Sequence, residues 1–258
     1  TVKATNNLSN RNLIINGAFQ IAQRGTSSTS TNYQTVDRWG GDAGGTNESP
    51  TFAQVDVASG TTPYQKGFRK AFRITNGNQT GGADAGDYMG CYTRLEAQDI
   101  ANSGWDYTST SSYITFSFWI KSSVAQNFYG YIYSADGSAQ KYPFETGSLT
   151  ADTWTKITKT IPGNSNIQID NNNGTGLQVQ FWSFLGTTYT GSVSLDAWGA
   201  WNSSTRIPDN TSTWYTTNDA TWEITGVQLE VGDVATDFEH RSYGDELARC
   251  QRYFHIIN

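Results

Sequence analysis

The feature that most constrains this chain is a run in which every second residue is apolar. Ile114, Phe116, Phe118 and Ile120 alternate with residues that are polar, apart from Trp119. Successive side chains of a β-strand point to opposite faces, whereas a helix repeats every 3.6 residues. The alternation therefore predicts a strand with one face buried in a core.

Similar alternation recurs in short segments along the chain. The further segments expected to form strands are 13–21, 53–57, 68–74, 89–95, 128–133, 155–161, 177–182 and 193–195. Turn-rich stretches such as Asp136-Gly137 and 170–176 separate them. About nine or ten strands with such links predict an all-β fold, specifically a β-sandwich of jelly-roll type.

Composition supports an ordered β-protein and excludes several functions. Aromatic residues make up 14% of the chain and charged residues 16%, the opposite of a disordered composition. A net charge of −6 argues against a nucleic-acid partner, which needs a basic surface. No apolar run approaches the ~20 residues that span a bilayer, so a membrane-embedded protein is not expected. Cys91 and Cys250 are expected to be buried thiols and not a disulfide.

The end of the chain combines a strand with an irregularity. Trp222 and Ile224 share one face, and the apolar positions then change parity to Val227 and Leu229. One extra residue in a β-bulge produces such a change, and glycine is common at bulges. The sequence therefore predicts a bulge at Gly226.

The only convincing helix follows this strand. Ser242 is a good N-cap, and Asp245 stands three residues later in the capping-box position. The helix is expected to have a narrow apolar stripe formed by Tyr243, Leu247, Cys250 and Phe254. A helix of about three turns is not stable alone in water, so it must pack on this domain or on a neighbouring chain.

Two terminal stretches also carry a resemblance. The stretch "GVQLEVGDVATDFEHRSYGDELARCQRYF" (226–254) resembles the end of the receptor-binding domain of phage tail-fibre proteins. The stretch "NLIINGAFQIAQRGT" (12–26) and Asp37-Arg38-Trp39 resemble its beginning. Between them, "ITFSFWIKSS", "WTKITKTI" and "LQVQFWSF" resemble strands of β-sandwich carbohydrate-binding modules. The resemblance covers nearly the whole chain.

The resemblance implies a domain plan and a biological setting. Residues 1–11 would link to an upstream fibre, 12–241 would form the receptor-binding sandwich, and 242–258 would form the helix and tail. It implies a non-enzymatic homotrimer on the virion, outside the cell, whose partner is a host cell-surface polysaccharide or lipopolysaccharide. No cofactor is expected. A calcium site of related sandwich modules is not expected, because Gln20 and Thr225-Gly226 stand where its acidic ligands would be.

Sugar binding would require exposed aromatic rings beside fixed polar groups, because pyranose faces are rich in C–H groups and their edges in hydroxyls. Two sets of residues fit this description. The first is a strip predicted from alternation: Trp119, Tyr129, Tyr131, Tyr133, Gln178, Gln180 and Trp182. The second is a loop set: Tyr189, Trp198, Trp201, Trp214 and Tyr215. The strip could instead be buried by another layer, and the loop rings could cap a sandwich end.

Catalytic residues are not apparent from the sequence. His240 and His255 are the only histidines, and neither accompanies a nucleophile motif. A glycosidase needs only two carboxylates placed by the fold, for which Asp84, Asp87, Asp196 and Glu223 are candidates. Two alternatives to a receptor-binding domain remain: a carbohydrate-binding module of a polysaccharide-degrading enzyme, and a structural fibre module without a ligand.

Overall fold

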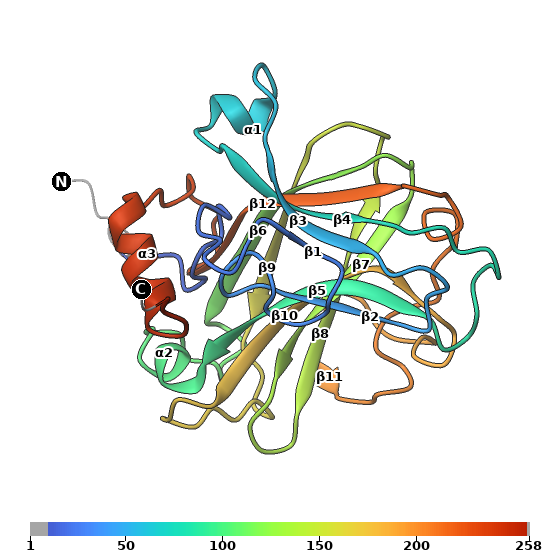
Figure 1. The fold of residues 1–258 in the computed structure, drawn as a ribbon. Coiled ribbons are helices and arrows are strands. Elements are labelled where there is room, and N and C mark those ends of the chain that lie inside the picture. Colours follow the sequence, from blue (N-terminus) through green and yellow to red (C-terminus); the bar gives the residue numbers. More distant parts are fainter. Residues whose placement is uncertain (1–9, 257–258) are drawn as a thin grey trace.

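The computed structural model describes residues 10–256, which fold into two antiparallel β-sheets packed face to face (Figure 1). Sheet I contains, in spatial order, β1 (Ser27–Ser28), β3 (Thr51–Asp56), β4 (Lys70–Thr75), β12 (Thr221–Val231), β6 (Tyr113–Ser122) and β9 (Thr155–Pro162). Sheet II contains β11 (Gly199–Ala200), β8 (Gln140–Ser148), β7 (Asn127–Ser134), β10 (Thr175–Leu185), β5 (Tyr88–Glu96) and β2 (Gly40–Gly44). The chain crosses repeatedly between the sheets, and this architecture confirms the predicted β-sandwich.

Phenylalanine rings from both sheets form the centre of the core. Phe116 and Phe118 of β6 point inward, as the alternation predicts, and both are fully buried. The ring centroid of Phe116 lies 5.5 Å from that of Phe144 in β8, and that of Phe118 lies 4.9 Å from that of Phe181 in β10. Close-packed rings from facing sheets hold the sandwich together.

The predicted bulge in β12 is confirmed. The register between β12 and β6 shifts between Thr225 and Gln228, and Gly226 has a φ of +61°. A Cβ atom at Gly226 would lie 2.5 Å from Cζ of the buried Phe68. Both the backbone conformation and the close approach of Phe68 therefore require glycine at this position.

The segment 13–21, predicted as the first strand, forms a compact turn instead. Asn16 and Phe19 have φ angles of +58° and +57°. The Asn16 side chain accepts a hydrogen bond from the Ile21 N–H (3.1 Å) and donates to the carbonyl groups of Ile21 and Asp37 (both 2.8 Å). Asparagine tolerates this left-handed conformation, and its amide satisfies backbone groups that a neighbouring strand would otherwise pair.

Two strands of sheet II, β2 and β8, lack the alternation of apolar residues, so the sequence does not predict them. Strand β2 looks like a glycine-rich loop, but a Cβ atom at Gly41 would lie 2.6 Å from the ring of Phe52, so the sheet edge needs glycine there. Strand β8 contains Pro143, which lacks an N–H donor. Its outer neighbour β11 pairs only with Gln140 and Lys141, so the proline stands where no outer strand needs a donor. The short strand expected at 193–195 is absent, and β11 forms a few residues later.

Helix α3 (Tyr243–Gln251) confirms the predicted helix and its start. The Ser242 side chain accepts a hydrogen bond from the backbone N–H of Asp245 (3.2 Å). Of the helix residues, only Cys250 is buried, while Tyr243 is 59% exposed, so the stripe packs on the domain mainly at its C-terminal end. Two further helices, α1 (Thr62–Gln65) and α2 (Ala97–Ala101), are too short to be predicted from periodicity.

The two terminal stretches contact each other at one end of the sandwich, where α3 lies beside α2 (Figure 1). The Glu239 carboxylate accepts a hydrogen bond from the backbone N–H of Asn12 (3.0 Å) and pairs with Arg241 at 3.1 Å. Glu246 of α3 accepts a hydrogen bond from the Asn16 N–H (2.5 Å). Residues 11–16 and 239–246 are named the terminal clasp. Its contacts explain how the helix is held without a long buried stripe.

The predicted linker and the cysteines can be placed in part. Residues 1–9 of the linker and 257–258 of the tail lie outside the described residues, whereas the backbone N–H of Arg11 donates to Glu239 (3.1 Å). Cys91 and Cys250 are buried and unpaired, which confirms the predicted thiols. Between residues 10 and 256, no helix has the length and apolar character needed to cross a membrane.

Candidate functional site

The outer face of sheet II carries aromatic and amide side chains in adjacent rows. Tyr131 of β7 lies opposite Gln180 of β10, and Tyr133 lies opposite Gln178. The intervening Ile132 points into the core. This side-by-side placement follows from the period-2 pattern of both strands. The surface formed by Tyr129, Tyr131, Tyr133, Gln178, Gln180 and Trp182 is named the aromatic face.

Trp119 does not belong to the aromatic face. It lies on β6 in sheet I, opposite Thr225, and packs in a separate cluster with Phe68 and Phe238. There it lines a cavity of about 560 Å³ together with His240. The expectation that Trp119 shares a surface with the tyrosines of β7 is wrong, because alternation within one strand does not reveal which sheet the strand joins.

The segment 186–210 folds over part of the aromatic face. The Trp201 ring meets the rings of Tyr133 and Tyr131 edge-on, with centroid distances of 4.7 and 5.3 Å. The guanidinium group of Arg206 lies 4.5 Å from the ring centroid of Tyr189 and 5.7 Å from that of Trp201. These cation–π and aromatic contacts fix the segment on the sheet. Tyr133, Tyr189 and Trp201 remain half-buried and accessible at its margin.

Two rings of the predicted strip lie beneath this cover. Tyr131 is 3% exposed and Trp182 is 2% exposed, and burial raises the pKa of Tyr131. Neither ring can present its face to a ligand in this conformation, so the expectation that they form exposed platforms is wrong. The cause is the loop, whose path the alternation of β7 and β10 does not encode.

Polar groups connect the aromatic face to the neighbouring strand β5. Arg94 Nε donates to Gln178 Oε1 (2.9 Å), and Gln178 Nε2 donates to Gln180 Oε1 (2.9 Å). Asp42 of β2 lies nearby, where burial raises its pKa although the guanidinium groups of Arg206 and Arg94 oppose the rise. The sequence does not predict this group of charged residues, because they come from segments far apart in the chain and no regular spacing connects them.

The loop set divides between a surface cavity and the core. Trp198 and Trp201 line a cavity of about 400 Å³ together with Lys141 and Thr205. Trp198 Nε1 donates to the carbonyl of Pro162 (2.7 Å), and the Lys141 ammonium donates to the carbonyl of Thr205. Burial lowers the pKa of Lys141, with the charge of Arg206 acting in the same direction. This cavity adjoins the aromatic face through the shared Trp201.

Trp214 and Tyr215 are core residues, so their predicted role as exposed rings is wrong. Both have 0% exposure. Trp214 Nε1 donates to the carbonyl of Thr221 (3.0 Å), and the Tyr215 hydroxyl donates to Asp87 (3.0 Å). The Tyr215 ring also stacks on Phe184 with a centroid distance of 4.3 Å. These two residues close the interior of the sandwich, which is the capping role that the sequence left open.

Of the carboxylates considered for catalysis, Asp84 and Asp87 lie together, with the Asp84 N–H donating to Asp87 Oδ2 (2.8 Å), whereas Asp196 and Glu223 pair with lysine or arginine side chains elsewhere. Glu223 in sheet I pairs with Arg73 (2.7 Å) and Lys121 (3.1 Å). His240 is exposed, with its Nε2 2.9 Å from the carbonyl of Lys66. Across the described part of the chain, no group of three or more His, Cys, Asp or Glu side chains is arranged to hold a metal ion.

Comparisons with known proteins return structural similarity at low sequence identity. No family model matches the sequence, and no curated protein matches it. The enzymatically active domain of tailspike protein 4 from bacteriophage CBA120 is 8% identical with a TM-score of 0.43, over 86% of this chain and 21% of that chain. The chain thus spans about a fifth of that tailspike structure.

Two binding modules show similarity of the same order. The tandem CBM22-1–CBM22-2 domain of Paenibacillus barcinonensis Xyn10C is 13% identical with a TM-score of 0.41, over 80% of this chain and 48% of that one. The N-terminal cellulose-binding domain of Cellulomonas fimi β-1,4-glucanase C is 11% identical with a TM-score of 0.37, over 84% and 99% of the two chains. None of these likenesses assigns a function to this chain.

Proposed function

We propose that this chain is a non-enzymatic glycan-binding domain whose site is the margin of the aromatic face. The observation that carries the proposal is the grouping of half-buried rings beside oriented polar groups. Tyr133 and Trp201 offer aromatic surface, while the hydrogen bond from Arg94 Nε to Gln178 Oε1 orients both polar side chains. Rings of this kind attract the C–H faces of sugars, and fixed amide and guanidinium groups bind hydroxyls.

The cavity beneath the neighbouring loop extends this site. Its volume of about 400 Å³ falls within the roughly 300–1,000 Å³ of small-ligand pockets. Trp198 and Trp201 supply two rings of its lining, and Lys141 supplies a cation. A saccharide lying across Trp201 would contact both the cavity and the aromatic face.

The biological setting proposed is the distal part of a phage tail fibre that attaches to a host cell-surface polysaccharide or lipopolysaccharide. The resemblance of the terminal stretches supports this setting. Those stretches meet in the terminal clasp, where their contacts with each other hold the scaffold. A homotrimer on the virion would present three sites and convert weak binding at each into strong attachment.

Mutation of matched tryptophans tests the site. Trp201→Ala and Trp198→Ala should each reduce binding on a glycan array and to host cells. Trp119→Ala is the control, because it is also a half-buried tryptophan but lies on sheet I. Loss of binding in Trp119→Ala alone would move the site to the sheet I cavity and contradict the proposal.

Light scattering and binding assays separate the alternatives. A tail-fibre domain should have a mass three times the 28.4 kDa of one chain. A carbohydrate-binding module of a polysaccharide-degrading enzyme would be a monomer that binds soluble polymer. A structural fibre module would form the trimer but bind neither the array nor cells.

A further inference from the structure

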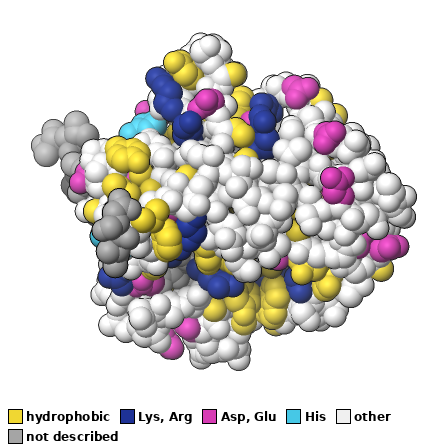
Figure 2. All heavy atoms as spheres, in the orientation of Figure 1, with side chains coloured by type: hydrophobic (Ala, Val, Ile, Leu, Met, Phe, Trp, Pro, Cys, Tyr) yellow, Lys and Arg dark blue, Asp and Glu magenta, His cyan; other side chains and the backbone are white. Residues whose placement is uncertain are grey.

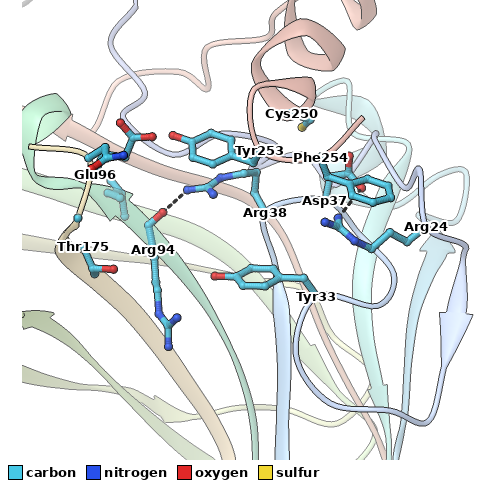
Figure 3. Close-up of a pocket in the computed structure, with 13 residues that line it drawn as sticks. Arg24, Tyr33, Asp37, Arg38, Arg94, Glu96, Thr175, Cys250, Tyr253 and Phe254 are labelled. Atoms are coloured by element: carbon cyan, nitrogen blue, oxygen red, sulfur yellow. Dashed lines mark hydrogen bonds and ion pairs between the residues drawn. The ribbon is translucent and has the colours of Figure 1, made fainter. Parts of the chain in front are cut away.

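A third cavity lies between the C-terminal end of α3, the end of β5 and the start of β10 (Figure 3). Its volume is about 290 Å³, close to the roughly 300 Å³ lower bound of small-ligand pockets. Three arginines line it: Arg24, Arg38 and Arg94. Tyr33 and Thr175 also line it, and Figure 3 shows them below the helix, on either side of Arg94. Neither alternation nor the terminal motifs predict this convergence.

Two of the arginines are held in place by aromatic rings. The guanidinium group of Arg38 lies 3.4 Å from the ring centroid of Tyr253, and that of Arg24 lies 3.5 Å from that of Phe254. An Nη of Arg38 also donates to the carbonyl of Arg94, whereas its Nε is buried without a partner. Such contacts reduce the conformational freedom that a ligand would otherwise have to remove.

The charges around the cavity leave an excess of positive charge. Asp37 pairs with Arg24 at 3.6 Å, and Glu96 pairs with Arg252 at 2.6 Å. Among residues 10–256, Arg38 and Arg94 have no carboxylate within 4.0 Å. The protein as a whole carries a net charge of −6, so this local excess runs against its overall composition. Positive groups inside an acidic protein concentrate anions locally.

The titration of Tyr33 agrees with this local field. Burial raises the pKa of its phenol, and the charges of Arg94, Arg38 and Arg24 all oppose the rise. All three guanidinium groups therefore act on one position within the cavity wall.

Arg94 connects the cavity to the aromatic face. Its side chain points away from α3 in Figure 3, and its Nε donates to Gln178 (2.9 Å). In Figure 2, basic side chains flank a cluster of hydrophobic ones on the lower part of the molecule, in the region of β8 and β11 in Figure 1. A chain of sugars on the aromatic face could thus extend past Arg94 to Arg38.

We infer that this cavity binds an anionic substituent of the glycan, a carboxylate or a phosphate, beside the Arg94 guanidinium, with Arg38 adding positive charge on the α3 side of the cavity. The inference rests on the proposed glycan-binding function and adds that the ligand is an acidic saccharide. Planar guanidinium groups match both anions and form two parallel hydrogen bonds with them. The Thr175 hydroxyl lines the same cavity and can donate a further hydrogen bond.

The test compares acidic and neutral probes by NMR. Glucuronate is titrated against its methyl ester, and glucose 6-phosphate against glucose, with inorganic phosphate as the smallest anion. The readout is the side-chain Nε–H signals of arginine. At least one acidic probe should bind ten times more tightly than its neutral partner and shift the signals of Arg38 and Arg94. The arm with the larger preference identifies the anionic group.

Arg94→Gln is the decisive variant, because Arg94 is exposed and its loss leaves the core intact. The preference for acid should disappear in Arg94→Gln and persist in Arg69→Gln, a control arginine that stacks on Tyr64 at 3.9 Å next to α1. Equal binding of acidic and neutral probes, or a preference that survives Arg94→Gln, would overturn the inference. If neutral glycans on the array still bind, the proposed function stands; if no glycan binds, the proposed function itself is refuted.

Discussion

Replacement of Trp214 by alanine separates a structural ring from a binding ring. Trp214 is fully buried, and its indole nitrogen donates to the carbonyl of Thr221. Removal of a buried tryptophan costs about 3–5 kcal/mol of unfolding free energy, because packing is lost and a cavity remains. The Thr221 carbonyl still accepts a hydrogen bond from the Ser123 N–H (3.0 Å), so no buried acceptor is left unpaired and no further penalty is expected.

That loss should appear as a lower melting temperature without a change in affinity. For a domain of this size, about 3–5 kcal/mol corresponds to a decrease of roughly 6–20 °C. Trp201→Ala should show the reverse pattern. It should cost about 1–2 kcal/mol of binding free energy, a factor of roughly 5–30 in glycan affinity, with a smaller change in melting temperature.

Thermal unfolding followed by circular dichroism, together with glycan binding below both melting temperatures, provides the assay. The reasoning would be refuted if Trp214→Ala melted like the parent protein but lost glycan binding. It would also be refuted if Trp201→Ala bound glycan unchanged while unfolding far more readily than Trp214→Ala.

Three further predictions concern the scaffold. Burial favours a raised pKa for Glu239, but hydrogen bonds from the Asn12 and Arg11 backbones and the charge of Arg241 hold the pKa below its usual 4.5. The ionised Glu239 therefore stabilises the fold above pH 4.5, and this contribution is lost as the pH falls through the lower pKa of the folded protein. Glu239→Gln should reduce the drop in melting temperature between pH 5 and 3. An unchanged drop would contradict this role of Glu239. Gly226→Ala should lower the unfolding free energy, measured by urea denaturation, by about 2–4 kcal/mol. The control Gly60→Ala should lower it by about 1–2 kcal/mol, because Gly60 also has a positive φ but has open space where a Cβ atom would lie. Equal losses would show that the contact with Phe68 is unimportant. A thiol reagent should label neither Cys91 nor Cys250 in the native protein and both after unfolding, since both thiols are buried and burial raises the pKa of each. Rapid labelling of Cys250 in the native protein would contradict this and show that α3 detaches.

The sequence predicts the elements whose own residues contain the signal. The period-2 run of β6, the parity change at Gly226 and the cap at Ser242 each act within a few neighbouring residues, and each is confirmed. The segment 13–21 is an exception, because its alternation predicts a strand but the chain forms a turn. The side-chain amide of Asn16 bonds the backbone of Ile21 and so replaces the hydrogen bonds of a neighbouring strand.

The candidate site depends on contacts between residues far apart in the sequence, which no local sequence pattern predicts. Burial of Tyr131 and Trp182 follows from the path of the segment 186–210, and this segment has no periodicity of its own. The cavity lined by Arg24, Arg38 and Arg94 combines Arg38 from the turn before β2, Arg94 from β5 and Tyr253 from just after α3. Long-range packing, and not propensity, decides which aromatic rings remain available for a ligand.

The most direct test of the glycan site is NMR of the tryptophan indole N–H groups during titration with a saccharide that binds on the array. The protein has nine tryptophans, so each indole reports on one position. The signals of Trp198 and Trp201 should shift most. Those of Trp119 in β6 and of Trp154, which lies just before β9 and packs in the same cluster as Trp119, should remain unchanged. Shifts confined to Trp119 and Trp154 would contradict a binding site on the aromatic face.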